Sequence, residues 1–204
     1  MADGIKKVYP LSKVGKARAK TDLALAQKRG DYFEKRKNLL FGAVNTVKDD
    51  IRKLEISIQE EYERNANWFG VFADSLFDIS TFVQIKAVHT ESLTIAGVRV
   101  ERFEKVEFEN IEIDISETPL WADEGIQFIK DQSIREIMIA CKRKKLELLD
   151  EALSEARSKE TLYKEILPPH IENQLQKITG QLADEERLSI GTSKIIVRNR
   201  KEAI

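Results

Sequence analysis

One stretch of this chain has the residue types of a phosphate-binding loop, namely Gly191, Thr192, Ser193 and Lys194. In a complete loop a second glycine stands five residues earlier, so that backbone amides can surround the phosphate, but here that position holds Glu186. The motifs HExxH, CxxC and GxSxG, which mark metalloproteases, paired-cysteine sites and serine nucleophiles, are absent as well. The sequence therefore predicts no catalytic residue, no nucleotide or cofactor site, and a chain that is not itself an enzyme.

The two histidines and the single cysteine are the remaining side chains suited to proton or metal chemistry. His89 and His170 stand far apart, and neither has a second histidine or a cysteine at metal-ligand spacing. Each lies near the end of a predicted element, where a solvated or capping histidine is commoner than a proton shuttle. Cys141 has no second cysteine with which to form an intramolecular disulfide, which indicates a reducing, cytoplasmic setting. We expect no metal site.

The composition favours long helices over a compact globule. Charged residues make up 34% of the 204 residues, above the roughly 25% typical of globular domains, beside 42% apolar residues. Only 9 glycines and 4 prolines interrupt the sequence. No run of about 18 apolar residues is present, so we expect no direct membrane insertion and only a peripheral link to a membrane through partner proteins.

A heptad pattern marks the first long helix. Its apolar residues step by four, three, four, three and four positions, which is the a/d seam of a coiled coil. Pro10 stands where such a helix would begin. A helical period continues through Phe69, Leu76 and Val83, so we predict one helix over about 11–85. The seam consists of Leu40, Val44, Val47, Ile51, Leu54 and Ile58.

A second seam with the same alternation lies in a helix predicted over about 121–198. Pro168 and Pro169 fall inside this stretch. Because proline removes a backbone hydrogen bond and clashes with the preceding turn, we expect a bend near 168–169. Lys145 occupies one seam position, where its charge would weaken the packing. The other seam residues are Ile134, Met138, Cys141, Leu148, Ala152, Ile171, Leu175, Ile178 and Leu182.

Between the two helices the apolar period changes from 3.5 to 2, which is typical of strands. Apolar residues alternate with polar ones from Leu93 to Val100 and again from Val106 to Ile115. Gly97 interrupts the first run and Asn110 the second, as a bulge or a bend would. We predict a small β-hairpin over about 92–116.

These elements predict a mainly α fold, with a long antiparallel two-helix coiled coil and a small central β-hairpin region in a single elongated domain over 1–204. The charge is unevenly distributed: residues 1–40 hold eleven basic against four acidic residues, residues 91–125 three against ten, and residues 187–204 five against one. Antiparallel pairing would bring both basic termini to one tip. The candidate contact residues of that tip are Lys13, Lys16, Arg18, Lys20, Lys28, Arg29, Arg198 and Arg200.

Several segments, in this order along the chain, resemble the D-subunit family of V-type and A-type ATPases. No single segment is diagnostic, but their order and spacing are. The segments are residues 26–30 (AQKRG), 33–40 (FEKRKNLL), 95–100 (IAGVRV), 157–169 (RSKETLYKEILPP) and 182–187 (LADEER), with Lys194 after them.

The resemblance implies the central stalk, or rotor shaft, of a rotary ATPase, which couples ATP hydrolysis or synthesis to translocation of H⁺ or Na⁺. It implies that both termini insert into a hexameric ring of catalytic A and B subunits, while the middle of the chain points towards the membrane rotor. It further implies the small F subunit of the stalk on the side of the shaft, and a membrane-ring adaptor subunit of the C/d type.

Two other classes share some of these features. A prefoldin-like chaperone or scaffold also places a β-hairpin between coiled-coil helices, but its helices are much shorter. A nucleic-acid-binding helical arm would use the basic termini, but this chain lacks aromatic residues among the basic residues of the tip. We therefore expect no nucleic-acid partner.

Overall fold

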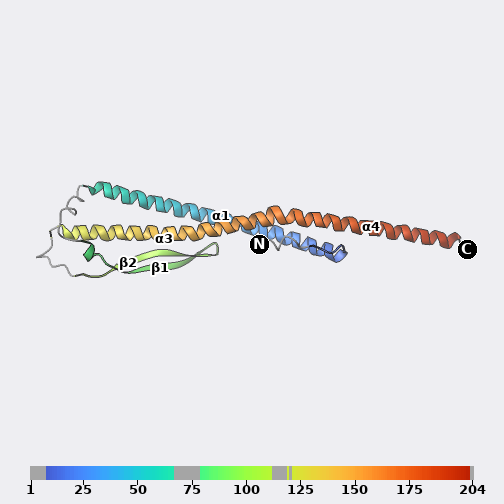
Figure 1. Cartoon of the computed structure of the whole chain (residues 1–204), viewed down its shortest axis with the longest axis horizontal. Coiled ribbons are helices and arrows are strands. Elements are labelled where there is room, and N and C mark those ends of the chain that lie inside the picture. Colours follow the sequence, from blue (N-terminus) through green and yellow to red (C-terminus); the bar gives the residue numbers. More distant parts are fainter. Residues whose placement is uncertain (1–7, 67–78, 112–118, 120, 203–204) are drawn as a thin grey trace. The chain divides into compact units, whose positions relative to one another are not determined.

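A computed structural model describes residues 8–66, 79–111, 119 and 121–202. It confirms the predicted fold class: along the chain, a two-stranded antiparallel hairpin comes between two long helical stretches (Figure 1). The elements are α1 (Lys13–Arg64), the 3-10 turn η1 (Ile79–Phe82), β1 (Ile85–Ile95), β2 (Val98–Phe108), α3 (Ala122–Thr161), the π-helical turn η2 (Leu162–Ile166) and α4 (Leu167–Glu202).

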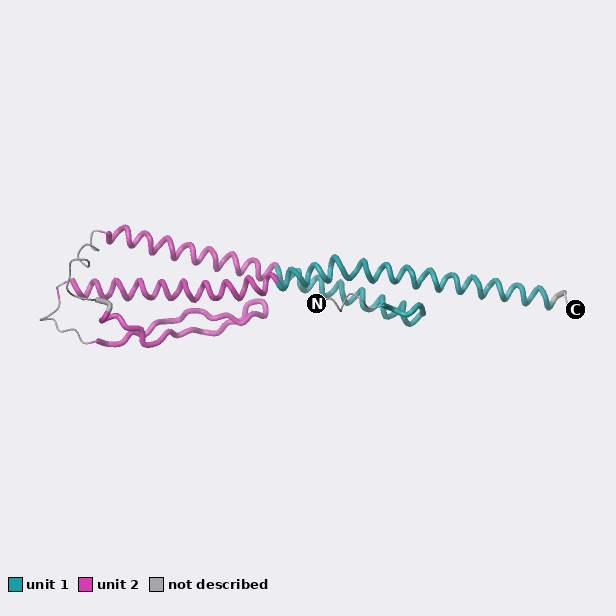
Figure 2. The backbone as a smooth tube through the Cα atoms, in the orientation of Figure 1, with its two compact units in different colours: residues 1–37, 155–204 teal, residues 38–154 magenta. Residues whose placement is uncertain are grey.

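The chain divides into two compact units (Figure 2). Unit 1 combines residues 1–37 with residues 155–204, and unit 2 comprises residues 38–154. Each unit therefore contains part of α1 and part of the second helical stretch. The expectation of a single elongated domain stays a prediction.

The helix pair of unit 2 is antiparallel and bordered by ion pairs. Along α1, Leu40, Val44, Val47 and Ile51 are buried at four- and three-residue steps. Ion pairs join later residues of α1 to earlier residues of α3, and earlier residues of α1 to later residues of α3, as antiparallel packing requires. They are Glu55–Arg143 (2.8 Å), Asp50–Lys142 (2.7 Å), Lys48–Asp150 (3.9 Å) and a contact between Glu61 and Arg135.

The hairpin lies earlier in the chain than expected. Strand β1 pairs with β2 from Ile85 opposite Phe108 to Ile95 opposite Val98. Ala96 and Gly97 form the two-residue turn, and both have positive φ angles, 48° and 81°. Two such residues are what a tight turn of type I′ needs, because its twist matches that of the strands. Gly97 is thus the turn and not a bulge within a strand. The predicted stretch 112–116 lies outside the described residues.

The first helix is shorter than the predicted 11–85. Helix α1 ends at Arg64, η1 occupies 79–82, and β1 begins at Ile85. Residues 67–78, which include Phe69 and Leu76, lie outside the described residues. The helical prediction was therefore wrong for 79–85, which comprises a short 3-10 turn, two residues outside any element and the first residue of β1.

Unit 1 has a core built from both of its helices and the segment before α1. Tyr9, Ala19, Ile171 and Ile178 are buried together, with Leu23, Leu175 and Leu182 packed against them. The backbone N–H of Tyr9 donates to Oε1 of Gln174 (3.1 Å), which ties the start of the described chain to α4. A side chain on Gly15 would meet the Pro10 carbonyl oxygen at 1.9 Å, so this return of the chain over α1 requires glycine.

The irregularity of the second helix lies just before the two prolines. In η2 the N–H of Leu167 donates to the carbonyl of Leu162, five residues earlier, which is the π-helical pattern. Pro168 and Pro169 follow directly as the second and third residues of α4, and neither has an N–H group to donate to the preceding turn. The expected interruption near 168–169 is thus a widened turn at 162–166, and the helical backbone continues through it.

Candidate functional site

The basic residues predicted to form a tip all belong to unit 1. Seven are exposed and Lys16 is half-buried. Among the described residues, Lys13, Lys16, Lys20 and Lys28 have no ion pair. The exposed members are Lys13, Arg18, Lys20, Lys28, Arg29, Arg198 and Arg200.

The structure does not bring the basic residues of the two helices to one place. Ala19 of α1 shares a core with Ile171 and Ile178 of α4. None of residues 179–200 of α4 is buried, and α4 continues past the start of α1 (Figure 1). Arg198 and Arg200 therefore lie about 30 Å along α4 from Ile178, at 1.5 Å per residue, on a stretch without α1 beside it.

This unaccompanied stretch of α4 carries apolar side chains that sequence reasoning missed. Leu188 is 71% exposed, Ile195 60% and Ile196 52%. The sequence pattern that could have identified them is the seven-residue spacing of Leu188 and Ile195. These two residues lie beyond Leu182, the last residue of the predicted seam. Large apolar side chains in such a row on a helix are typical of a surface that a partner covers.

An aromatic and ionic layer joins α1 to η2 in unit 1. The rings of Phe33 and Tyr163 stack with centroids 5.6 Å apart, and the guanidinium of Arg29 lies 5.5 Å from the Tyr163 centroid. The ammonium of Lys164 donates to Glu34 (2.8 Å), and this contact lowers the pKa of Glu34 and raises the pKa of Lys164. One basic residue of the predicted tip, Arg29, is therefore held by a contact within the chain.

A close approach of the backbones accompanies this layer. A Cβ atom on Gly30 would lie 2.8 Å from Cγ of Lys164 and 3.6 Å from the carbonyl carbon of Tyr163. The glycine within the AQKRG segment thus lets η2 lie directly against α1. Lys37 and Glu160, whose charged groups are 2.8 Å apart, lie in the same helix pair.

The seam residues occupy two kinds of surroundings. On α1, Leu54 and Ile58 are half-buried beside the four buried members named above. On the second stretch, Ala152, Ile171 and Ile178 are buried, while Leu148 is 38% exposed and its neighbour Leu149 is fully buried. The half-buried members are Ile134, Met138, Cys141, Leu175 and Leu182.

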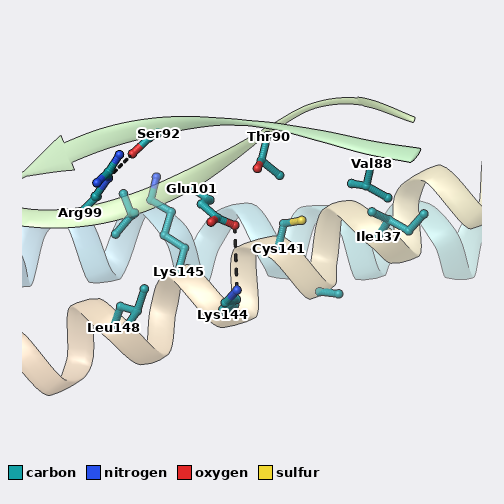
Figure 3. Close-up of a pocket in the computed structure, with 12 residues that line it drawn as sticks. Val88, Thr90, Ser92, Arg99, Glu101, Ile137, Cys141, Lys144, Lys145 and Leu148 are labelled. Carbon is teal, nitrogen blue, oxygen red and sulfur yellow. Dashed lines mark hydrogen bonds and ion pairs between the residues drawn. The ribbon is translucent and has the colours of Figure 1, made fainter. Parts of the chain in front are cut away.

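Leu148 is exposed although it was predicted to lie in the seam, and its position on α3 explains the difference. Cys141, Lys145 and Leu148 line a cavity between α3 and the hairpin (Figure 3). The ion pairs with α1 come from Arg135, Lys142 and Arg143, on another part of the helix surface. Helix α3 has two packing neighbours, and part of the predicted seam faces the hairpin.

The remaining candidates for chemistry are scattered. His89 Nε2 lies 3.2 Å from a carboxylate oxygen of Glu107, and His170 Nε2 lies 2.9 Å from Nε2 of Gln174. Gly191 to Lys194 are helical, within α4. Over the described residues, no three metal-ligating side chains come together, and no helix is long and apolar enough to span a membrane.

Comparison with known proteins agrees with this architecture along nearly the whole chain. The model of the family described as the D subunit of ATP synthase matches residues 16–198. A V-type ATP synthase D subunit from Borreliella burgdorferi is 25% identical over 195 residues, which cover 93% of this chain and 96% of the relative. The V-type ATP synthase D subunit of Chlamydia pneumoniae is 23% identical over 86% of this chain and 85% of its own.

A shorter match points the same way. The V-type ATP synthase D subunit of Chlamydia muridarum is 28% identical over 101 residues, half of each chain. The family model spans both helical stretches and the hairpin between them, in the order that the structure shows. The chain belongs to the D-subunit family of ATP synthases.

Proposed function

We propose that this chain is the central stalk, or rotor shaft, of a V/A-type rotary ATPase. It would couple ATP hydrolysis or synthesis in a catalytic hexamer to rotation of a membrane ring and translocation of H⁺ or Na⁺. The chain itself would carry out no chemistry, and would work at the cytoplasmic side of a membrane as a peripheral part of the complex.

The observation that carries this proposal is the end of α4. A helix that continues beyond its partner with Leu188, Ile195 and Ile196 exposed has apolar surface that no other described part of the chain covers. At about 25 cal/mol per Å² of apolar area, covering these side chains would supply several kcal/mol. A ring of A and B subunits around this end is the partner that membership of the family suggests.

The positions of the basic residues also favour insertion of this end of the chain into the ring of A and B subunits. Lys13, Arg18, Lys20 and Lys28 are exposed on the same unit as this free stretch of α4. A local excess of one charge sign speeds encounter with a partner cavity of opposite sign and sets orientation. The middle of the chain, with its acidic excess over residues 91–125, would then point towards the membrane rotor and its C/d-type adaptor, with the F subunit on the side of the shaft.

The mechanism would be conformational coupling. A shaft without threefold symmetry makes different contacts with each of three equivalent ring sites. Each orientation therefore favours an open conformation at one site and a closed conformation at another, and the ring's nucleotide state in turn favours one orientation. This requires a shaft that transmits torque, which the packed helix pairs of both units would provide.

Affinity purification of the tagged full-length chain from its native cell tests the assignment. We expect A, B and F subunits to co-purify in fixed proportion with a C/d-type adaptor. Recovery of the chain with unfolded client proteins and without these subunits would contradict the shaft role and support the chaperone alternative.

A charge-reversal variant tests the inserted end. Arg18, Lys28 and Arg29 changed together to Glu should impair insertion into a hexamer of A and B subunits without unfolding the chain. Its matched control changes Arg52, Lys53 and Lys86, three exposed basic residues of unit 2, to Glu. Circular dichroism checks the fold and size-exclusion chromatography the complex; equal insertion of both variants would remove the basic end from the proposal.

A further inference from the structure

A cavity lies between α3 and the hairpin, within unit 2. It has a volume of about 600 Å³, within the roughly 300–1,000 Å³ range of small-molecule sites. Four short side chains are among those that line it. They are Thr90 and Ser92 of β1, and Ala140 and Cys141 of α3.

The walls of the cavity are mainly apolar. Val88 and Val100 come from the two strands, and Ile137 and Leu148 come from α3, one turn or more on either side of Cys141. In Figure 3, Val88 points towards Ile137, while Thr90 points from β1 towards Cys141. A ligand here would place an apolar body between strand and helix, with the hydroxyls of Thr90 and Ser92 among the lining groups.

Three of the residues lining the cavity are cations, and two of them are already engaged. Lys144 lies 3.9 Å from Glu101, the one carboxylate among the lining residues, and Nε of Arg99 donates to the Ser92 hydroxyl (2.7 Å). Lys145 is half-buried and has no hydrogen bond or ion pair with any described residue. It reaches from α3 towards the strands (Figure 3).

The surroundings of Lys145 disfavour its charge. Burial comes first and the charge of Lys142 second in lowering the pKa of Lys145. Asp50 acts in the opposite direction, but its carboxylate accepts a hydrogen bond from Lys142 at 2.7 Å. A half-buried ammonium without a counter-ion would gain most from an anion that enters beside it.

We propose that this cavity binds a small amphipathic carboxylate, with its apolar chain against Val88, Val100, Ile137 and Leu148 and its head group on Lys145. A single ammonium matches a single negative charge. A nucleotide would place two or three phosphates there, and the cavity offers no glycine-rich backbone for them. A divalent cation would find only Glu101, already beside Lys144.

Cys141 allows occupancy to be measured directly. It is the one cysteine of the chain and it lines the cavity. The rate at which a thiol reagent modifies the full-length protein therefore reports access to this site. Octanoate should slow modification in a saturable manner, octanol should require a higher concentration for the same protection, and octylammonium should protect least.

Variants at Lys145 separate the head-group contact from general apolar binding. Lys145→Met keeps the length of the side chain and removes the charge, and should raise the half-protecting octanoate concentration about tenfold, as loss of a charge-assisted hydrogen bond does. Lys145→Arg should restore protection. Lys177→Met, which removes an exposed lysine of α4, serves as the matched control and should behave as the unmodified chain.

Two results would overturn the proposal. Equal protection of the unmodified chain and the Lys145→Met variant by octanoate would show that the head group does not lie on Lys145. Unchanged Cys141 modification across all octanoate concentrations, together with no shift of hairpin or α3 resonances in NMR spectra, would show that the cavity does not take such a ligand.

Discussion

The two units use their helices differently. In unit 1, the α1 segment and α4 have each other as neighbours, and their contacts form one row of apolar residues beside one aromatic and ionic layer. In unit 2, α3 packs against α1 and also against the hairpin. A helix with one neighbour needs one apolar stripe, whereas a helix with two neighbours needs two, and its sequence period is harder to interpret.

The largest effect should come from the two adjacent leucines of α3. Leu149 is fully buried and Leu148 is 38% exposed. Leu149→Ala should lower the free energy of unfolding by about 2–5 kcal/mol, because it leaves a cavity in the packed face. Leu148→Ala, the matched control, should cost about 1 kcal/mol or less. Chemical denaturation measures both, and a larger cost at Leu148 would reverse the assignment of the two faces.

Ionisation of Tyr9 should lower the free energy of unfolding of unit 1 as the pH rises into the alkaline range. Burial, followed by the hydrogen bond from its hydroxyl to Asp22 (2.7 Å), raises the pKa of Tyr9 from 10.0 to about 12. The folded state then holds this proton more tightly than the unfolded state. The contribution is complete below pH 10 and is lost as the pH rises from 10 towards 12, by about 2–3 kcal/mol in total at about 1.4 kcal/mol per unit.

The measurement is the melting temperature at several pH values for the unmodified chain and for Tyr9→Phe. Other tyrosines and lysines titrate in the same range, so the difference between the two chains isolates Tyr9. Tyr9→Phe should lose less stability than the unmodified chain between pH 9.5 and 11.5, a window of about two units around the shift. Parallel curves would contradict the raised pKa.

Two glycines of α1 should respond in opposite directions. Gly42→Ala should stabilise unit 2 by about 0.5–1 kcal/mol, because no atom lies within 4 Å of the new Cβ and glycine weakens a helix interior. Gly30→Ala should destabilise unit 1 by about 1 kcal/mol, because its Cβ would displace Lys164 and with it the contact to Glu34. Thermal unfolding compares the two, and a gain at both positions would mean that η2 can move away from α1.

The smallest effect concerns Lys145. Replacing this half-buried cation with Leu should raise stability by about 1 kcal/mol or less, because an unpaired ammonium is removed from a mainly apolar cavity. Lys177→Leu, at an exposed position of α4, should give no such gain. In the assembled ATPase, we expect Lys145→Leu also to alter coupling between ATP hydrolysis and ion transport. A stability gain with unchanged coupling would separate this lysine from torque transmission.

The sequence predicted burial best where a helix has a single apolar stripe. Leu40, Val44, Val47 and Ile51 are buried because α1 offers one continuous stripe, and the stripe repeats every seven residues. The chain's family resemblance and its helical character were likewise visible in order and composition.

The hairpin and α3 were less accessible for physical reasons. Apolar alternation continues on both sides of Gly97, so periodicity alone cannot distinguish a turn from a bulge; the positive φ angles of Ala96 and Gly97 settle it. The start of β1 was missed because Ile85 follows apolar residues that also fit a helical period. Leu148 and Leu149 are adjacent leucines, and the helical period alone does not distinguish Leu149, which is buried, from Leu148, which lines the cavity beside the hairpin.

The widened turn η2 has a consequence for the counting of residues along unit 1. Ile171 lies fifteen positions after Ala156, one more than two heptads, yet both are buried. The π turn accommodates that extra residue, since a turn with bonds to the fifth residue takes one more residue than an α turn. Removing one residue from 162–166 should therefore leave Ile171 and Ile178 facing α1. Removing one from 172–177 would rotate Ile178 by about 100° away from the core. Within 162–166, the second helical stretch of unit 1 can therefore lose one residue while the later residues still face α1.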